Sequence, residues 1–125
     1  MRKFPSLKSG SDFKRVYDNG ISYGNKFLVM YILKNTYSEN RLGISISKKV
    51  GNSVIRHKIT RQLREIFKLD ISGYKKYIEN EYKNNQLNMY YDIVIIVRKD
   101  AAVLEYNKLR DSFMHLYSRF RLRNK

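Results

Sequence analysis

The chain has 125 residues, 42% of them hydrophobic, which is enough apolar material for the core of one domain. Its 26 lysines and arginines exceed its 11 acidic residues and give a formal net charge of +15, which is typical of a protein that binds a polyanion such as nucleic acid. It has no cysteine, no signal-peptide pattern and no apolar run of membrane-spanning length, so we expect one cytoplasmic domain over residues 1–125 with no disulfide, thiolate metal site or membrane segment.

A short helix is predicted near the start of the chain. Residues 1–8 form a basic arm that we expect to be flexible, and Ser9, Gly10 and Ser11 then offer candidate N-terminal caps for a helix. Asn19 and Gly20 supply a stop signal. Between cap and stop, apolar side chains recur at helical spacing at Phe13, Val16 and Tyr17. This pattern predicts the first helix.

Two strands are predicted next. Residues 27–33 are a continuous apolar run rich in strand-forming residues, and residues 41–47 alternate large apolar with small side chains. The polar residues 35–40 between them are typical of a turn. We therefore expect the two strands to form an antiparallel pair.

The apolar period changes from two to about 3.6 at residues 52–68, which predicts a second, longer helix. Residues 51–53 supply its N-terminal cap. Its apolar stripe consists of Ile55, Ile59, Leu63, Ile66 and Phe67. One face of this helix is therefore expected to pack against the sheet.

The last part of the chain predicts a loop, a strand and a helix. Residues 69–91 lack a sustained apolar period and indicate a loop or insertion with an irregular helical turn. Residues 92–97 contain five branched apolar residues in a row, which favours a strand buried on both faces. A final helix is predicted over residues 104–119, followed by a basic tail at 120–125. The element order predicts an α/β (α+β) sandwich, with one sheet of three to four strands and about three helices.

Positive charge is concentrated on the helix at 52–68 and in the loop before it. Seven lysines and arginines and a single acid, Glu65, lie between Lys48 and Lys68. At about 100° per residue, the side chains opposite or flanking the apolar stripe are Arg56, His57, Lys58, Arg61, Arg64 and Lys68. An ordinary solvated helix face mixes both signs, whereas like charges three or four positions apart repel by about 0.2–0.5 kcal/mol per pair. We therefore favour a polyanion-binding surface over an ordinary solvated face.

Residues 41–65 closely resemble, without a gap, the signature of the bacterial ribonuclease P protein: RLGISISKKVGNSVIRHKITRQLRE. The resemblance extends to residues 12–17 and 92–98 and to Ala101 and Ala102, while residues 69–91 fall outside it. It implies a ribosomal protein S5 domain 2-like fold in which the helix at 52–68 lies in a left-handed βαβ crossover. Such connections are otherwise right-handed in about 98% of cases.

The chain departs from the family signature at two places. The family's central Arg-Asn-Arg triplet is Arg56-His57-Lys58 here, and a lysine usually found two positions later is Thr60. Because a lysine lacks the planar fork with which arginine binds phosphate in a bidentate manner, Lys58 is expected to bind less tightly or to follow a different RNA contour.

The resemblance implies two binding surfaces and a division of labour. The family's basic helix and adjoining loop dock on a catalytic RNA, a role that falls here on Lys48, Lys49, Asn52, Arg56, Lys58, Arg61 and Arg64, with His57 and Lys68 on the same face. The first helix and the sheet receive the 5′ leader of precursor tRNA, a role that falls on Phe13, Tyr17 and Tyr31. The family's RNA carries out the hydrolysis with bound magnesium ions, so the resemblance implies no catalytic residue and no cofactor in the protein.

Each candidate has a plainer interpretation. The spacing of Phe13 and Tyr17 alone favours core packing, and only the resemblance favours a leader contact. Tyr31, in the middle of a predicted strand, weakly indicates an open sheet face. His57 lies among cations and is interpreted as an RNA contact, whereas His115 is expected to be merely exposed.

Other functional classes explain fewer of these features. A stand-alone RNA-binding protein of the ribosomal type would share the composition and the cationic helix, and only the signature distinguishes it. A helix-turn-helix DNA-binding protein would need a helix directly before the basic one, where a strand is predicted. A protein-only nuclease would need clustered carboxylates, but Asp92, Asp100 and Glu105 are scattered along the sequence.

Overall fold

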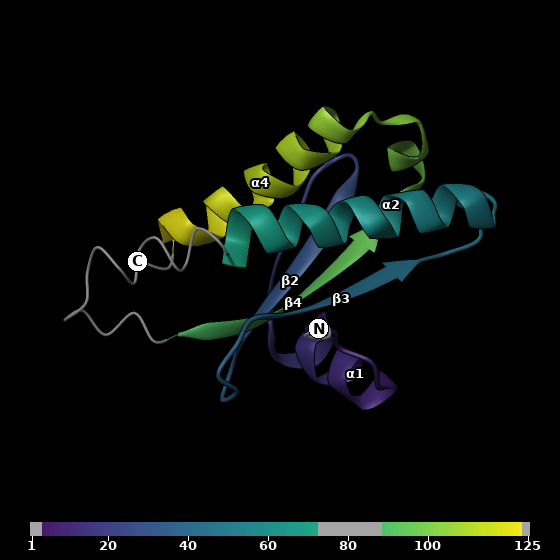
Figure 1. Cartoon of the computed structure of the whole chain (residues 1–125). Helices are drawn as coiled ribbons and strands as arrows, with labels where there is room; N and C mark the ends of the chain where they lie inside the picture. Colours follow the sequence, from purple (N-terminus) through teal and green to yellow (C-terminus); the bar gives the residue numbers. More distant parts are fainter. Residues whose placement is uncertain (1–3, 73–88, 124–125) are drawn as a thin grey trace.

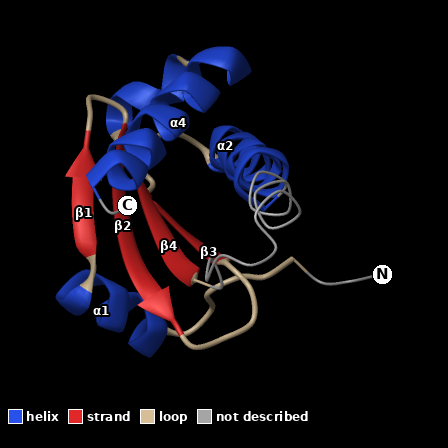
Figure 2. Ribbon diagram, turned by 90° about the vertical axis from the view of Figure 1, so that its left-hand side faces the viewer, coloured by secondary structure: helices blue, strands red, loops and turns tan. Residues whose placement is uncertain are grey.

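The computed structural model describes residues 4–72 and 89–123, which form one four-stranded sheet with helices on both faces (Figures 1 and 2). The elements in chain order are α1 (Gly10–Asn19), β1 (Ile21–Gly24), β2 (Leu28–Asn35), β3 (Arg41–Ile46), α2 (Ser53–Ile66), η1 (Phe67–Ser72), β4 (Tyr90–Val97), η2 (Lys99–Val103) and α4 (Tyr106–Arg123). Helix α1 covers one face of the sheet, and α2 and α4 cover the other (Figure 2). The predicted α/β architecture with about three helices and up to four strands is confirmed.

The strand order is β1-β2-β4-β3. β4 pairs antiparallel with β2 and parallel with β3. The predicted direct pairing of β2 with β3 is therefore wrong: the two strands run in opposite directions, but β4 lies between them. The branched apolar run of β4 is buried on both faces, which only an inner strand of a covered sheet allows.

The parallel strands β3 and β4 are joined through α2, and this crossover is left-handed, as the resemblance implied (Figures 1 and 2). This hand is rare because the usual twist of strands favours the opposite one. It brings α2 over the outer strand of the sheet, beside α4 and away from α1 (Figure 2). The long exposed side of α2 is thereby left uncovered by the described elements.

Local contacts explain where α1 and α2 begin and where α1 ends. The Ser9 hydroxyl accepts a hydrogen bond from the Asp12 amide at 3.1 Å, and the Asn52 side chain accepts one from the Ile55 amide at 3.0 Å. Gly20 ends α1, where an added Cβ atom would lie 2.6 Å from the Val16 carbonyl oxygen. The predicted caps and the predicted stop are confirmed.

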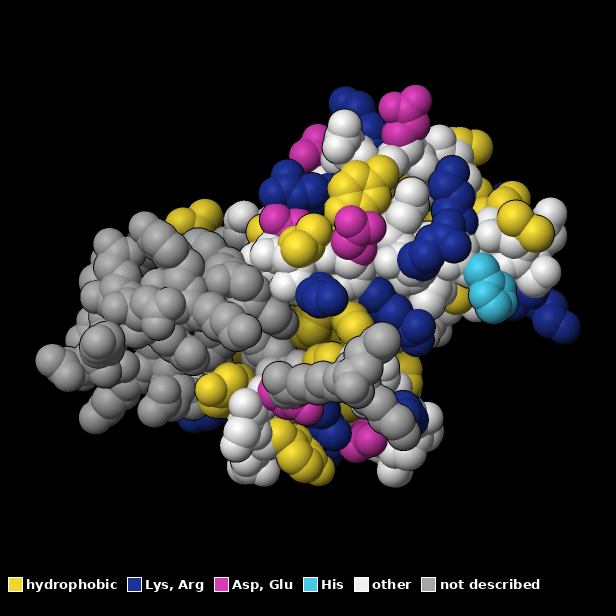
Figure 3. Space-filling view, viewed as in Figure 1, with side chains coloured by type: hydrophobic (Ala, Val, Ile, Leu, Met, Phe, Trp, Pro, Cys, Tyr) yellow, Lys and Arg dark blue, Asp and Glu magenta, His cyan; other side chains and the backbone are white. Residues whose placement is uncertain are grey.

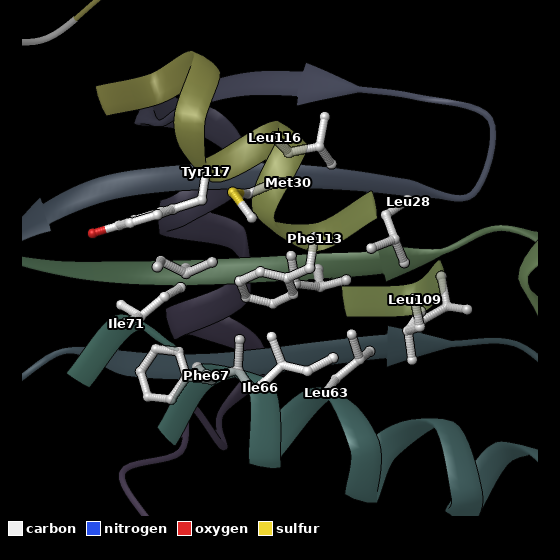
Figure 4. Packing of buried hydrophobic residues seen from close by; sticks show 14 of the residues in the cluster. Leu28, Met30, Leu63, Ile66, Phe67, Ile71, Leu109, Phe113, Leu116 and Tyr117 are labelled. Carbon is white, nitrogen blue, oxygen red and sulfur yellow. The ribbon is translucent and has the colours of Figure 1, made fainter. Parts of the chain in front are cut away.

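The main core lies between the sheet and the pair α2 and α4 (Figure 4). Its fully buried side chains include Leu28, Met30, Leu63, Ile66, Phe67, Leu109, Phe113 and Leu116. Each such side chain stabilises the fold by roughly 1.5–3 kcal/mol relative to an exposed one. The predicted stripe of α2 is therefore its buried face, although Ile55 is only half-buried.

The second half of the chain agrees only in part with the sequence-based expectations. η1 continues α2 as a single irregular turn, as predicted, but most of the expected loop, residues 73–88, lies outside the described residues. The final helix starts at Tyr106, because residues 99–103 form a separate 3-10 turn. It continues through the expected tail to Arg123, and its Phe120 is buried in the core.

The second face of the sheet has a smaller apolar cluster beneath α1, centred on Leu7, Val16 and Val94. Part of the expected N-terminal arm takes part in this layer. The Leu42 amide donates to the Pro5 carbonyl at 2.9 Å, and the Leu7 amide donates to the Leu42 carbonyl at 3.1 Å. The segment before α1 therefore lies along β3, the outer strand of the sheet.

Candidate RNA interface

A ridge of basic side chains follows the loop before α2, α2 itself and the start of η1. This basic ridge consists of Lys48, Lys49, Arg56, His57, Lys58, Arg61, Arg64 and Lys68. All of these side chains are exposed except Arg56, which is half-buried. Figure 3 shows lysine and arginine side chains gathered over α2 on this side of the molecule. The structure thus places every predicted basic residue of the motif on α2 or on the segments directly before and after it.

The cations of the basic ridge lack acidic partners within residues 4–72 and 89–123: none of its lysines or arginines forms an ion pair there. Elsewhere, arginines of the protein do find carboxylates, as Arg110 does with Asp70 at 2.7 Å. The mutual repulsion expected from the sequence is therefore not relieved by these residues. An arrangement of this kind is stabilised by an external polyanion.

Three members of the predicted interface also have contacts within the protein. The Arg56 side chain donates from Nε to the Gly51 carbonyl at 3.2 Å, which holds it against the loop before α2. The Arg64 guanidinium lies 5.5 Å from the ring centre of Phe4. The Asn52 side-chain oxygen caps α2, so its amide group alone remains available for a ligand.

The three predicted aromatic residues lie together on the α1 side of the sheet. The ring centres of Phe13 and Tyr17 are 6.2 Å apart, and those of Tyr17 and Tyr31 are 5.0 Å apart in an edge-to-face arrangement. All three are half-buried, so neither full core packing nor full exposure describes them. We call this group the aromatic cluster.

The close approach of α1 to the sheet depends on a glycine. A Cβ atom added to Gly43 would lie 2.7 Å from the Phe13 ring and 3.1 Å from the Leu7 side chain. The adjacent row of this sheet face is half-buried and is formed by Val29, Ser45 and Ile96. A partly apolar strip therefore continues from the aromatic cluster along the sheet.

A buried ion network, not predicted from the sequence, lies on the other flank of α1. Asp92 accepts a bidentate pair of hydrogen bonds from Arg41, both at 2.8 Å, one from Arg15 at 2.6 Å and one from the Asn35 amide at 2.8 Å. Burial alone would raise the pKa of Asp92, but the hydrogen bonds from Arg41, Arg15 and Asn35 together hold it below its ordinary value. The carboxylate is thus kept charged inside the protein.

Other kinds of site find little support in the described part of the chain. It contains no group of three or more His, Asp or Glu side chains that could hold a metal ion, and none of its helices is long and apolar enough to cross a membrane. His57 is exposed on α2, while His115 is exposed on α4 with its Nδ1 atom 3.5 Å from the Asn25 side-chain nitrogen.

An α/β protein with a basic helix on one side of its sheet, not neutralised by acids in the described part of the chain, and half-buried aromatic rings on the other belongs to the class of polyanion-binding proteins. The family can be given as well. The family model for ribonuclease P matches residues 1–121, and the chain belongs to the ribonuclease P protein family.

Relatives and solved structures agree with this assignment. The chain is 46% identical to the ribonuclease P protein component of Lachnoclostridium phytofermentans over 111 residues, which cover 89% of this chain and 84% of the relative. It is 34% identical to that of Natranaerobius thermophilus, with 100% and 97% covered. The RNase P protein of Staphylococcus aureus superimposes with a TM-score of 0.73 at 33% identity, and the match covers 93% of this chain and 94% of that structure. The RNase P protein of Thermotoga maritima superimposes with a TM-score of 0.70 at 26% identity, and the match covers 91% of this chain and 94% of that structure.

Proposed function

We propose that this chain is the protein subunit of a cytoplasmic bacterial ribonuclease P, which removes the 5′ leader of precursor tRNA. The basic ridge binds the catalytic RNA, and the aromatic cluster binds the leader. The RNA carries out the hydrolysis with its bound magnesium ions, and the protein improves substrate binding and lowers the magnesium requirement. The observation that supports this most strongly is the positive charge along α2, which no acid of the described residues pairs with.

The positions of the two surfaces suit a protein that joins two RNAs. The basic ridge lies on α2, on one side of the sheet, and the aromatic cluster lies under α1 on the other (Figure 2). Two RNA strands repel each other, and cations between them reduce that repulsion. A net charge of +15 on this small protein supplies such cations.

The contacts of the basic ridge divide its members into two kinds. Arg61, Lys58 and Lys68 are exposed and form no ion pair within residues 4–72 and 89–123, so their side chains can follow an RNA backbone. Arg56 and Arg64 are held by Gly51 and Phe4, and a held guanidinium loses less conformational freedom when it binds phosphate. We assign the remaining contacts to Lys48, Lys49, Asn52 and His57.

The aromatic cluster suits a leader of variable sequence. Each base has a face that can stack on an aromatic ring, so stacking needs no particular base, and it contributes roughly 1–3 kcal/mol per base. Half-burial fixes the rings of Phe13, Tyr17 and Tyr31 while leaving part of each accessible. The apolar row beside them extends the surface along the sheet.

Cleavage of a precursor tRNA at low magnesium concentration tests the proposed function. A bacterial ribonuclease P RNA alone, this protein alone and the two together should be compared. We expect little cleavage by either component alone and clear stimulation by the mixture, because the protein's cations replace part of the magnesium. Cleavage by the protein alone would require a catalytic site of its own. No stimulation, combined with binding to unrelated RNAs, would favour a stand-alone RNA-binding protein.

Replacing Tyr17 with alanine should weaken binding of precursor tRNA about tenfold, toward the lower end of the roughly 1–3 kcal/mol expected for one stacked base. Phe13→Ala should act similarly. Binding of mature tRNA, which lacks a leader, should not change. Tyr17→Phe keeps the ring and serves as the matched control. Equal losses for both tRNAs in variants with unchanged circular dichroism would show that the cluster does not bind the leader.

A further inference from the structure

Asp92 is the one charged side chain that is buried among the described residues, with 0% of its side chain exposed. Its partners come from three different elements. Arg41 lies on the adjacent strand β3, Asn35 on the other adjacent strand β2, and Arg15 on α1. Arg15 is the only one of them that does not belong to the sheet. The Arg15–Asp92 ion pair is therefore a direct polar link between α1 and the inner strand β4.

The link lies on the opposite flank of α1 from the aromatic cluster. Successive side chains of a helix are about 100° apart, and Val16 points to the sheet. Arg15 therefore lies roughly 100° to one side of Val16. The mean direction of Phe13 and Tyr17 lies about 80° to the other side. The contacts agree with this geometry, because Val16 is fully buried and Tyr17 meets Tyr31. α1 is thus held to the sheet on both flanks, by ions on one and by rings on the other.

The ionic flank constrains the helix more sharply than the aromatic one. Apolar contacts are non-directional, so a helix resting on Val16 and aromatic rings alone can roll or slide on the sheet. The 2.6 Å contact from Arg15 Nη2 to Asp92 is directional, and its acceptor is itself fixed by the bidentate pair from Arg41. A roll of α1 that moves Tyr17 relative to Tyr31 also shifts Arg15 relative to Asp92, so the ion pair opposes it.

We propose that Arg15 and Asp92 are positioning residues for leader binding: their ion pair fixes the roll of α1 and thereby the spacing of Tyr17 from the sheet. This inference rests on the proposed function of the aromatic cluster. It assigns the other flank of α1, away from the aromatic cluster, a part in leader affinity. The catalytic RNA, which binds across the sheet at α2, is unaffected by the pair.

The test compares neighbouring substitutions on α1 in the assembled ribonucleoprotein. Arg15→Met keeps the length of the side chain and removes its charge, whereas Arg15→Lys keeps the charge. Lys14→Met is the matched control, because Lys14 forms an ion pair with Asp18 in which the two side chains are 76% and 56% exposed. Two quantities are measured: the ratio of affinities for precursor and mature tRNA, and the NMR contact between the rings of Tyr17 and Tyr31 in the full-length protein.

We expect Arg15→Met to reduce the precursor-to-mature affinity ratio about tenfold and to weaken the ring contact. Arg15→Lys should recover part of both, and Lys14→Met should change neither. An unchanged ring contact in Arg15→Met would overturn the inference, including when leader affinity falls, since Arg15 would then act on the leader directly. If the ring contact is lost and leader affinity is unchanged, the aromatic cluster does not bind the leader. The proposed positioning role of Arg15 and Asp92 then fails as well.

Discussion

Replacing both Arg61 and Arg64 with alanine is expected to weaken binding of the catalytic RNA about a hundredfold at low salt. Both side chains are exposed on α2 and have no acidic partner among the described residues. A hydrogen bond to a charged group contributes roughly 1.5–3 kcal/mol, so two contribute about 3–6 kcal/mol. Because the site is exposed, we expect a loss of binding free energy near the lower end of that range. The fold should be unaffected, since neither residue is part of the core.

The dependence of this affinity on salt provides the sharper measurement. Each phosphate contact contributes about 0.9 to the slope of log K against log salt concentration, so the double variant should lose close to two units of slope. Lys34→Ala with Lys108→Ala removes two exposed cations from β2 and α4 and controls for the change in net charge. Equal slopes for the wild type and the Arg61 and Arg64 double variant would exclude direct phosphate contacts by these arginines.

Replacing Asp92 with alanine should lower the free energy of unfolding by about 3–5 kcal/mol, the range typical when one partner of a buried ion pair is removed. The cost is high because Arg41, whose side chain is only 14% exposed, keeps its charge and loses both of its bidentate hydrogen bonds. Asn35 also loses an acceptor. Urea titration followed by circular dichroism measures the difference.

The dependence of stability on pH identifies the charge of Asp92 as the cause. Its pKa is lower in the folded protein than in the unfolded chain, so its contribution is fully present above an unfolded value near 4 and is lost as the pH falls through the folded value. The wild type should therefore lose stability below about pH 4 more steeply than Asp92→Ala. Asp18→Ala, which removes a surface ion pair, should change stability by less than about 1 kcal/mol. Parallel pH profiles for the wild type and Asp92→Ala would contradict this account.

The sequence was most informative where the physical signal is local. The apolar stripe that predicts α2 and the apolar run that predicts β4 are both periodicities of neighbouring residues, and both elements are observed. Strand pairing is not local. The polar turn at 35–40 favoured direct pairing of β2 with β3, whereas the need to bury both faces of β4 placed that strand between them. β1 has only four residues and a single buried side chain, too few to give a clear alternation.

The candidate site was likewise predictable only where its signal is local in the sequence. Cations at helical spacing on one exposed face are visible in the sequence, and the structure gathers them into the basic ridge. The network around Asp92 was missed because its partners Arg15, Asn35 and Arg41 are 77, 57 and 51 positions away. A single acidic residue at the start of a strand forms no recognisable sequence motif. The family resemblance supplied the aromatic cluster, for which spacing alone favoured the core.

The place of β4 in the sheet has a consequence for the growing chain on the ribosome. β2 ends at Asn35 and β3 at Ile46, but the strand that joins them begins only at Tyr90. At roughly 5–20 residues per second, the 55 positions from Asn35 to Tyr90 take about 3–11 s to synthesise. Until β4 is made, β2 lacks one neighbour in the sheet and β3, complete at Ile46, lacks β4, so the backbone N–H and C=O groups along one edge of each strand stay without their partners in the sheet. Completion of the sheet is therefore a late event, governed by contacts distant in sequence, and the nascent chain exposes strand edges until it occurs.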